Sequence, residues 1–140
     1  MPIRLDPAKR AAFEAVLPAI GAFKKAFARD LSMGFVAEIY AARDLDLQLP
    51  DRPNEPGADA TDNGGQRYQI KHRSPSTLNV DLNNFNFDHL VLVNLDDDYR
   101  LVGMWSLPVE QAKSLFMFRE RFGKYQATQD RVKHAATRVR

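Results

Sequence analysis

The feature that most constrains the fold is a nearly continuous apolar run at His89–Leu95, with the sequence HLVLVNL. A strand with one covered face alternates apolar and polar side chains, whereas this run is apolar at almost every position. Such a run is typical of a central strand that is buried on both faces. The chain must therefore place other elements on each side of this strand, which favours a layered α/β fold.

Two helical patterns precede this strand. Asp6 and Pro7 form a helix start, because an acidic side chain can cap the first turn and proline fits within it. Pro18 removes one backbone donor, so the sequence predicts a kink or two short helices there. Asp30 could cap a second helix. The apolar residues at helical spacing are Phe13, Val16, Leu17, Ile20, Phe23 and Phe27 in the first helix, and Leu31, Phe35, Ile39 and Ala42 in the second.

The remaining pattern predicts short strands joined by turns. The expected elements are a loop at 50–57, strands at 58–61 and 66–72, a polar loop at 74–87, a turn at 96–98, a strand at 99–105 and a helix that begins at Pro108. The order predicts a single α/β domain over residues 1–140, with a sheet flanked by helices on both faces. Its core would span about residues 31–118, followed by a basic C-terminal tail at 119–140.

Composition narrows the class of protein. The chain has no cysteine, which excludes disulfides and thiolate metal sites and fits a reducing compartment. No apolar run approaches the roughly 20 residues that cross a bilayer, and charged residues interrupt the amino terminus where a signal peptide would be apolar. We therefore expect a cytoplasmic protein with no membrane partner. No Gly-rich phosphate loop follows a strand, which disfavours nucleotide-binding folds.

The positive charge is concentrated at one end of the chain. Residues 119–140 contain seven Lys and Arg residues against two Asp and Glu residues, whereas the remainder holds thirteen basic and sixteen acidic groups. This asymmetry allows contacts with a phosphate backbone, although a solvated C-terminal helix would have the same composition. The candidate nucleic-acid-binding residues are Arg67, Arg73, Lys124, Arg131 and Lys133.

The hairpin at 58–72 holds the candidate catalytic and metal-binding residues. Side chains alternate along a strand, so Gln69 and Lys71 share one face while Ile70 points to the other. If residues 63–65 form a three-residue loop, Asp59 lies directly opposite Gln69, with Cβ atoms about 4.5–5.5 Å apart. A two-residue turn would instead pair Asp59 with Tyr68 and send its carboxylate to the wrong face.

Such a site suits phosphodiester hydrolysis, which needs an activated water and neutralisation of charge on the phosphate. Mg²⁺ can serve both needs, and it prefers hard oxygen ligands while it retains several waters. A carboxylate at Asp59, a carbonyl oxygen at Gln69 and a cation at Lys71 provide the minimal set. Asp62 is more typical of a turn residue than of a metal ligand.

The segments Gly57-Ala58-Asp59 and Gly65–Arg73 (GQRYQIKHR), preceded by Glu38 in a helix, resemble the core of the PD-(D/E)XK, or restriction endonuclease-like, nuclease superfamily. The resemblance covers about residues 31–106. More narrowly, it resembles small uncharacterised members with a Gly-x-Asp…Gln-Ile-Lys core. It implies a central mixed sheet flanked by helices, one or two Mg²⁺ (or Mn²⁺) ions, and DNA as substrate.

The resemblance also implies roles for four residues. Asp59 would be the principal metal ligand, Gln69 would occupy the second acidic position, Lys71 would position the water or stabilise the transition state, and Glu38 would be an auxiliary carboxylate. Here Ala58 stands where the superfamily has its nominal proline, and Gln69 replaces an acid. An amide keeps an oxygen ligand but loses a unit of charge, so metal affinity should fall unless Glu38 compensates.

Three functional hypotheses follow. The first is a Mg²⁺-dependent DNA nuclease, for which cleavage of both strands would favour a homodimer. The second is a catalytically weak or inactive module of the same fold that binds DNA or a protein partner. The third is a protein-binding immunity or adaptor domain with no DNA affinity. Metal binding separates the first from the second, and DNA binding separates the third from both.

Overall fold

The computed structural model describes residues 2–51 and 58–140. The chain divides into two compact units, Met1–Ser32 and Met33–Arg140, and each is described by itself. The loop expected at 50–57, which includes Gly57 of the resemblance, lies almost entirely outside the described residues. No described helix is long and apolar enough to cross a membrane.

The first unit consists of one helix, α1 (Pro7–Phe27), and its flanking residues. Asp6 caps this helix as expected, because its carboxylate accepts a hydrogen bond of 2.9 Å from the Lys9 N–H. The helix continues through Pro18, so the alternative of two short helices is wrong. One missing donor is tolerated because the turns on either side of the proline keep their own hydrogen bonds.

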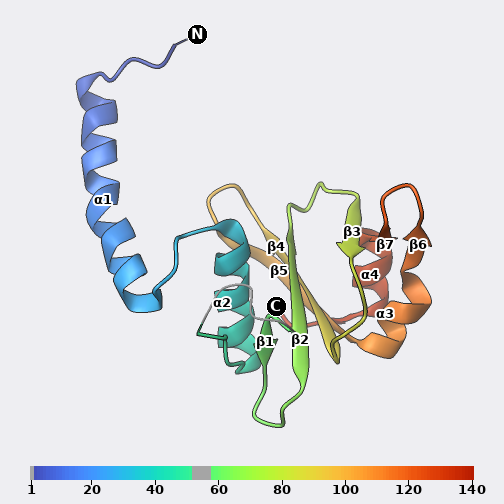
Figure 1. Ribbon diagram of the computed structural model, residues 1–140. Helices are drawn as coiled ribbons and strands as arrows, with labels where there is room; N and C mark the ends of the chain where they lie inside the picture. The colour runs from blue at the N-terminus through green and yellow to red at the C-terminus, as the bar shows by residue number, and fades with distance from the viewer. Residues whose placement is uncertain (1, 52–57) are drawn as a thin grey trace. The chain divides into compact units, whose positions relative to one another are not determined.

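The second unit is built on a five-stranded sheet with the order β1-β2-β4-β5-β8. Its strands are β1 (Ala60–Thr61), β2 (Arg67–Arg73), β4 (His89–Leu95), β5 (Leu101–Pro108) and β8 (Thr137–Arg138). Strands β2 and β4 run parallel, whereas the other neighbours are antiparallel. The sheet is therefore mixed, and the expected α/β class is confirmed (Figure 1).

Strand β4 is covered on both faces, as its apolar run predicted. Val91 and Val93 pack with Ala37 and Ala41 of helix α2 (Met33–Leu45). On the other face, Leu90 and Leu92 join a second cluster, which includes residues from helices α3 (Val109–Leu115) and α4 (Gln129–Ala135). The two clusters together bury β4 almost completely.

A second sheet, which the sequence did not predict, packs with α3 and α4 on the face of the first sheet that bears Leu90 and Leu92. It consists of β3 (Asn79–Leu82), β7 (Lys124–Thr128) and β6 (Met117–Arg119), in the order β3-β7-β6. Strand β3 lies inside the segment expected to be a polar loop. Its alternation of polar Asn79 and Asp81 with buried Val80 and Leu82 is the signal that sequence reasoning missed.

The basic segment 119–140 is part of the fold and not a tail. It contributes β7, α4 and β8, and Val132 of α4 is fully buried in the core. Gln129 anchors it: its Oε1 accepts a hydrogen bond of 2.8 Å from Asn94 of β4, and its Nε2 donates to the backbone carbonyls of Ser74 and Thr77. The positive charge of this segment lies on the exposed sides of elements whose other sides are buried.

Candidate functional site

The turn between β1 and β2 sets the register of the site. The Asp62 N–H donates to the Gln66 carbonyl over 3.0 Å, which closes a three-residue loop of Asn63, Gly64 and Gly65. Gly65 has a φ of 79°, the left-handed conformation that such loops need at their last residue. Asp62 serves the turn, as expected, because its Oδ1 accepts the N–H groups of residues 64 and 66.

Asp59 and Gln69 meet as this register requires. Ala60 pairs with Tyr68, so the preceding Asp59 lies opposite Gln69. The Gln69 Nε2 donates to Asp59 Oδ2 over 3.0 Å, and the Ile70 N–H donates to the same oxygen over 2.8 Å. Of the two turn lengths that the sequence left open, the structure has the three-residue loop, and Asp59 lies opposite Gln69 as that alternative required.

Burial shapes the electrostatics of Asp59. It raises the pKa of the carboxyl above its usual range, and the Ile70 hydrogen bond and the charge of Lys71 only partly offset this effect. A carboxylate held in a partly dehydrated position interacts more strongly with a nearby cation than one in bulk water does. Asp59 is therefore placed to attract a cation.

Lys71 lies on the same face of β2 as Gln69. Gln69 and Lys71 pair with Leu90 and Leu92, whose side chains belong to the core on the side of the second sheet. Burial lowers the pKa of the Lys71 ammonium, and the positive charges of Arg73 and Lys124 lower it further. Asp59 and Asp81 oppose this shift.

The second sheet thus brings two more residues near Lys71. Asp81 of β3 and Lys124 of β7 are close enough for their charges to affect its pKa. Lys124 was a candidate from its basic surroundings, whereas Asp81 was missed because its segment was expected to be a loop. The Gln126 Nε2 holds Asp81 Oδ1 at 2.9 Å, so this carboxylate already has a partner.

The donor set fits a weakly held, water-rich Mg²⁺ ion. The two hydrogen bonds from Gln69 and Ile70 both go to Asp59 Oδ2, so Oδ1 can face a metal ion, and Gln69 offers a carbonyl oxygen once its amide turns. Among the described residues, no group of three or more His, Cys, Asp or Glu side chains could hold a metal ion. Two protein oxygens with several waters still suit Mg²⁺, which gives up its waters reluctantly.

Glu38 and His72 belong to the other side of the sheet. Helix α2, which carries the half-buried Glu38, packs on the face that bears Ile70. The His72 ring lies beside Gly34 at the start of this helix, and burial lowers its pKa. The participation of Glu38 in the site stays a prediction.

The five candidate nucleic-acid-binding residues occupy different settings. Arg73 donates to the carbonyls of Asn79 and His72, and so ties β2 to β3. Arg67 pairs with Asp88 at 3.6 Å, and the Lys133 Nζ lies 4.6 Å from the centre of the Trp105 ring. Lys124 is near Lys71, and Arg131 lines a pocket. The candidates therefore do not form one uniform patch.

Comparison with known proteins adds no family assignment: the chain matches no family model, and no curated protein is similar to it.

Proposed function

We propose that this protein is a Mg²⁺-dependent nuclease that hydrolyses phosphodiester bonds in DNA, with a restriction endonuclease-like arrangement of its sheet and site. The observation that carries the proposal is the side-by-side placement of Asp59 and Gln69, with Lys71 on the same strand face. A turn one residue shorter would have separated these groups. Mn²⁺ would replace Mg²⁺ in such an oxygen site.

Each residue has a defined part in the proposal. Asp59 and Gln69 would hold the metal, which supplies charge neutralisation and an activated water when bound. Lys71 would donate to the phosphate oxygens, where its ammonium stabilises the negative charge that develops in the transition state. Glu38 lies on the helix that covers the opposite face of the sheet, so the proposal gives it no part in the metal site. Arg73 and Lys124 would raise the local concentration of the polyanionic substrate.

One observation favours the second candidate, a module of this fold that binds DNA or a protein partner without efficient cleavage. The group that Gln69 directs at Asp59 is its amide NH₂, and this hydrogen bond satisfies the carboxylate without a metal. A glutamate at this position would add a negative charge, whereas glutamine adds none. The competition between this hydrogen bond and metal binding decides between the two candidates.

Cleavage of supercoiled plasmid and branched DNA in Mg²⁺ or Mn²⁺ tests the nuclease proposal. We expect wild-type protein to cut, and Asp59→Ala and Lys71→Ala to lose activity by about 100-fold or more, as for a lost electrostatic contact in the transition state. Lys113→Ala is the matched control, because Lys113 is a surface lysine of α3. Folded wild-type protein that cuts no nucleic acid with either ion would contradict the proposal.

Isothermal calorimetry separates the two candidates. The nuclease binds Mg²⁺ or Mn²⁺ at Asp59, and the Asp59→Ala variant does not, whereas the binding module shows no such heat. Gln69→Glu should tighten metal binding, because it replaces a neutral ligand with a charged one. Light scattering of the full chain measures whether the protein is the homodimer expected of an enzyme that cuts both strands.

A further inference from the structure

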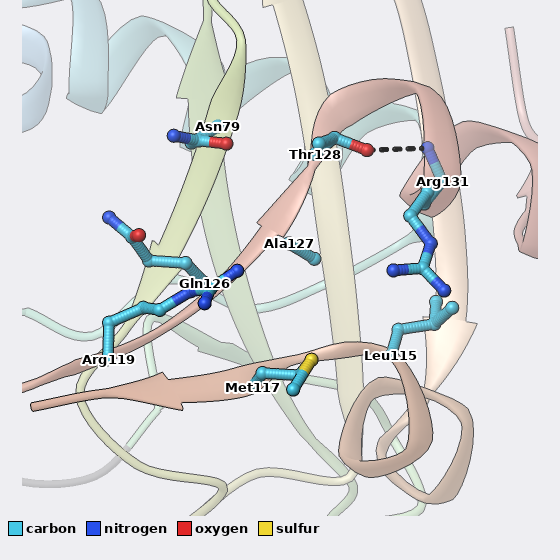
Figure 2. A pocket seen from close by; sticks show the side chains of 8 residues that line it. All are labelled: Asn79, Leu115, Met117, Arg119, Gln126, Ala127, Thr128 and Arg131. Atoms are coloured by element: carbon cyan, nitrogen blue, oxygen red, sulfur yellow. Dashed lines mark hydrogen bonds between the residues drawn. The ribbon is translucent and has the colours of Figure 1, made fainter.

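A pocket on the outer face of the second sheet is separate from the hairpin site. Its volume is about 110 Å³, and its described lining residues are Asn79, Leu115, Met117, Arg119, Gln126, Ala127, Thr128 and Arg131 (Figure 2). They come from all three strands of the second sheet, from α3 and from α4. The pocket is therefore a product of the tertiary fold and not of one local motif.

Two arginines give the pocket its charge. Arg119 extends from β6 and Arg131 from α4, and no carboxylate is among the described lining residues (Figure 2). Neither guanidinium forms an ion pair or hydrogen bond with the described part of the chain, in contrast to Arg43, Arg67 and Arg140. Guanidinium groups that are free of protein partners can bind an anion through paired N–H donors.

The neutral polar groups supply further donors. The Thr128 Oγ1 accepts the Arg131 N–H at 3.3 Å (Figure 2), and a hydroxyl that accepts one hydrogen bond can still donate its own hydrogen to a ligand. The Asn79 amide NH₂ can donate from β3. Two guanidinium groups, a hydroxyl and an amide suit the several acceptor oxygens of a phosphate group better than they suit a carboxylate, which has only two oxygens.

Hydrogen bonds connect the pocket to residues near the hairpin site. Gln126 lines the pocket and also donates to Asp81, whose charge acts on Lys71. Asn79 also lines the pocket, and its backbone carbonyl accepts a hydrogen bond of 3.1 Å from Arg73 of β2. Two residues that line the pocket are therefore hydrogen-bonded to residues next to the hairpin site.

We propose that this pocket binds a phosphate group of a nucleic-acid backbone, and so holds the strand at a fixed distance from the Asp59, Gln69 and Lys71 side chains. The inference rests on the proposed nuclease function for its substrate class. The contact is to the backbone and therefore independent of base sequence. This proposal differs from general attraction of DNA to a basic segment, because binding would depend on two particular arginines and not on the total charge of residues 119–140.

Fluorescence anisotropy of a labelled single-stranded DNA, measured with EDTA over a range of salt concentrations, tests this subsite. Arg119→Ala combined with Arg131→Ala should weaken binding about tenfold or more, as for lost charge-assisted hydrogen bonds. The salt dependence should also fall by about 0.7 in log–log slope for one phosphate contact. Arg4→Ala combined with Arg100→Ala removes the same charge from exposed positions outside the pocket and should bind like wild type.

A second measurement distinguishes the source of the phosphate. In spectra of isotope-labelled protein, the oligonucleotide should shift the Arg119 and Arg131 side-chain N–H signals at lower concentration than inorganic phosphate does. Shifts with inorganic phosphate alone would overturn the assignment to a nucleic-acid backbone. Equal DNA affinity of the pocket variant and its charge-matched control would overturn the subsite itself.

The subsite and the nuclease can fail separately. Asp59→Ala should lose cleavage and keep the pocket-dependent DNA affinity. Cleavage that depends on Asp59, with no effect of the two arginines on binding, leaves the nuclease standing and rejects the subsite. Pocket-dependent binding without any cleavage rejects the nuclease and retains the subsite as part of a DNA-binding module.

Discussion

At the scale of single residues, the candidate site combines charged groups with partial burial. Burial acts on Asp59 and Lys71 in opposite directions, because it disfavours the charged form of each: the carboxyl pKa rises and the ammonium pKa falls. Their mutual attraction offsets part of this cost without removing it. Partly buried charged side chains with shifted pKa values are typical of functional sites, where groups needed for activity can lower the stability of the fold.

Lys71→Met should therefore stabilise the protein at neutral pH. The folded-state pKa of Lys71 is lowered, so the charged lysine costs stability below that pKa, and the cost disappears as pH rises toward the ordinary value of 10.5. Solvent screening limits the gain to below about 1 kcal/mol, which is a rise in Tm of about 2–4 °C. Calorimetric melting at pH 7 and pH 9.5 should show a smaller gain at the higher pH.

The control for this prediction is Lys113→Met, which removes a surface lysine that pairs with Glu110 at 3.4 Å. It should change stability by less than about 0.5 kcal/mol at both pH values. A lower Tm for Lys71→Met than for wild type would show that Lys71 is a structural residue, and the reading of its burial as a functional cost would then be wrong.

At the scale of elements, two features align the site: the β1–β2 turn, and a buried network of hydrogen bonds made by Gln129 and Asn94. The turn decides which face Asp59 occupies. The network joins Gln129 of α4 to Asn94 of β4 and to the loop before β3, so it positions the second sheet against the first. Asn94 also donates to the Arg73 carbonyl over 3.2 Å, at the end of β2.

Gly65→Ala should destabilise the hairpin by about 1 kcal/mol, because an alanine at a positive φ suffers a clash that glycine avoids. Gly64→Ala is the matched control: Gly64 does not have a positive φ, and an added Cβ would meet the Asp62 Oδ1 at 3.4 Å. Urea unfolding compares the two. Equal loss of stability in both variants would argue against the left-handed position at Gly65.

Gln129→Leu should destabilise the second unit by about 2 kcal/mol or more, because it removes the hydrogen bonds that Gln129 makes with the buried Asn94 amide and with the backbone carbonyls of Ser74 and Thr77. Gln111→Leu, at an exposed position of α3, should be nearly neutral. Urea unfolding measures both changes. A neutral Gln129→Leu would mean that the network does not hold α4 in place.

At the scale of the whole molecule, both core clusters draw their residues from positions 33–140. The second unit is therefore predicted to fold without residues 1–32. A chain that begins at Met33 should unfold in one cooperative transition, with the same urea midpoint as this unit has in the full chain. The fluorescence of Trp105, the single tryptophan, reports the transition in both chains. Loss of cooperative unfolding in the shortened chain would show that its core is incomplete.

The sequence alone was sufficient for the local features of the fold and site. The unbroken apolar run at residues 89–95 required cover on both faces of β4, and the glycines after Asp62 indicated a hairpin turn, although its length was decided only by the structure. These inferences succeeded because they depend on side-chain alternation and on backbone conformations that few residues adopt. The hydrophobic pattern also located α1, α2, β2, β4 and α3.

Only the tertiary structure decided what surrounds the hairpin. The short strands β3, β6 and β7 carry too few residues to show a clear period, and long-range pairing stabilises them. Their pairing turns the apparent basic tail into part of the core, brings Asp81 and Lys124 near Lys71, and places Arg119 and Arg131 around one pocket. The sequence determined the chemistry of each side chain, whereas contacts between distant segments determined which side chains could act together.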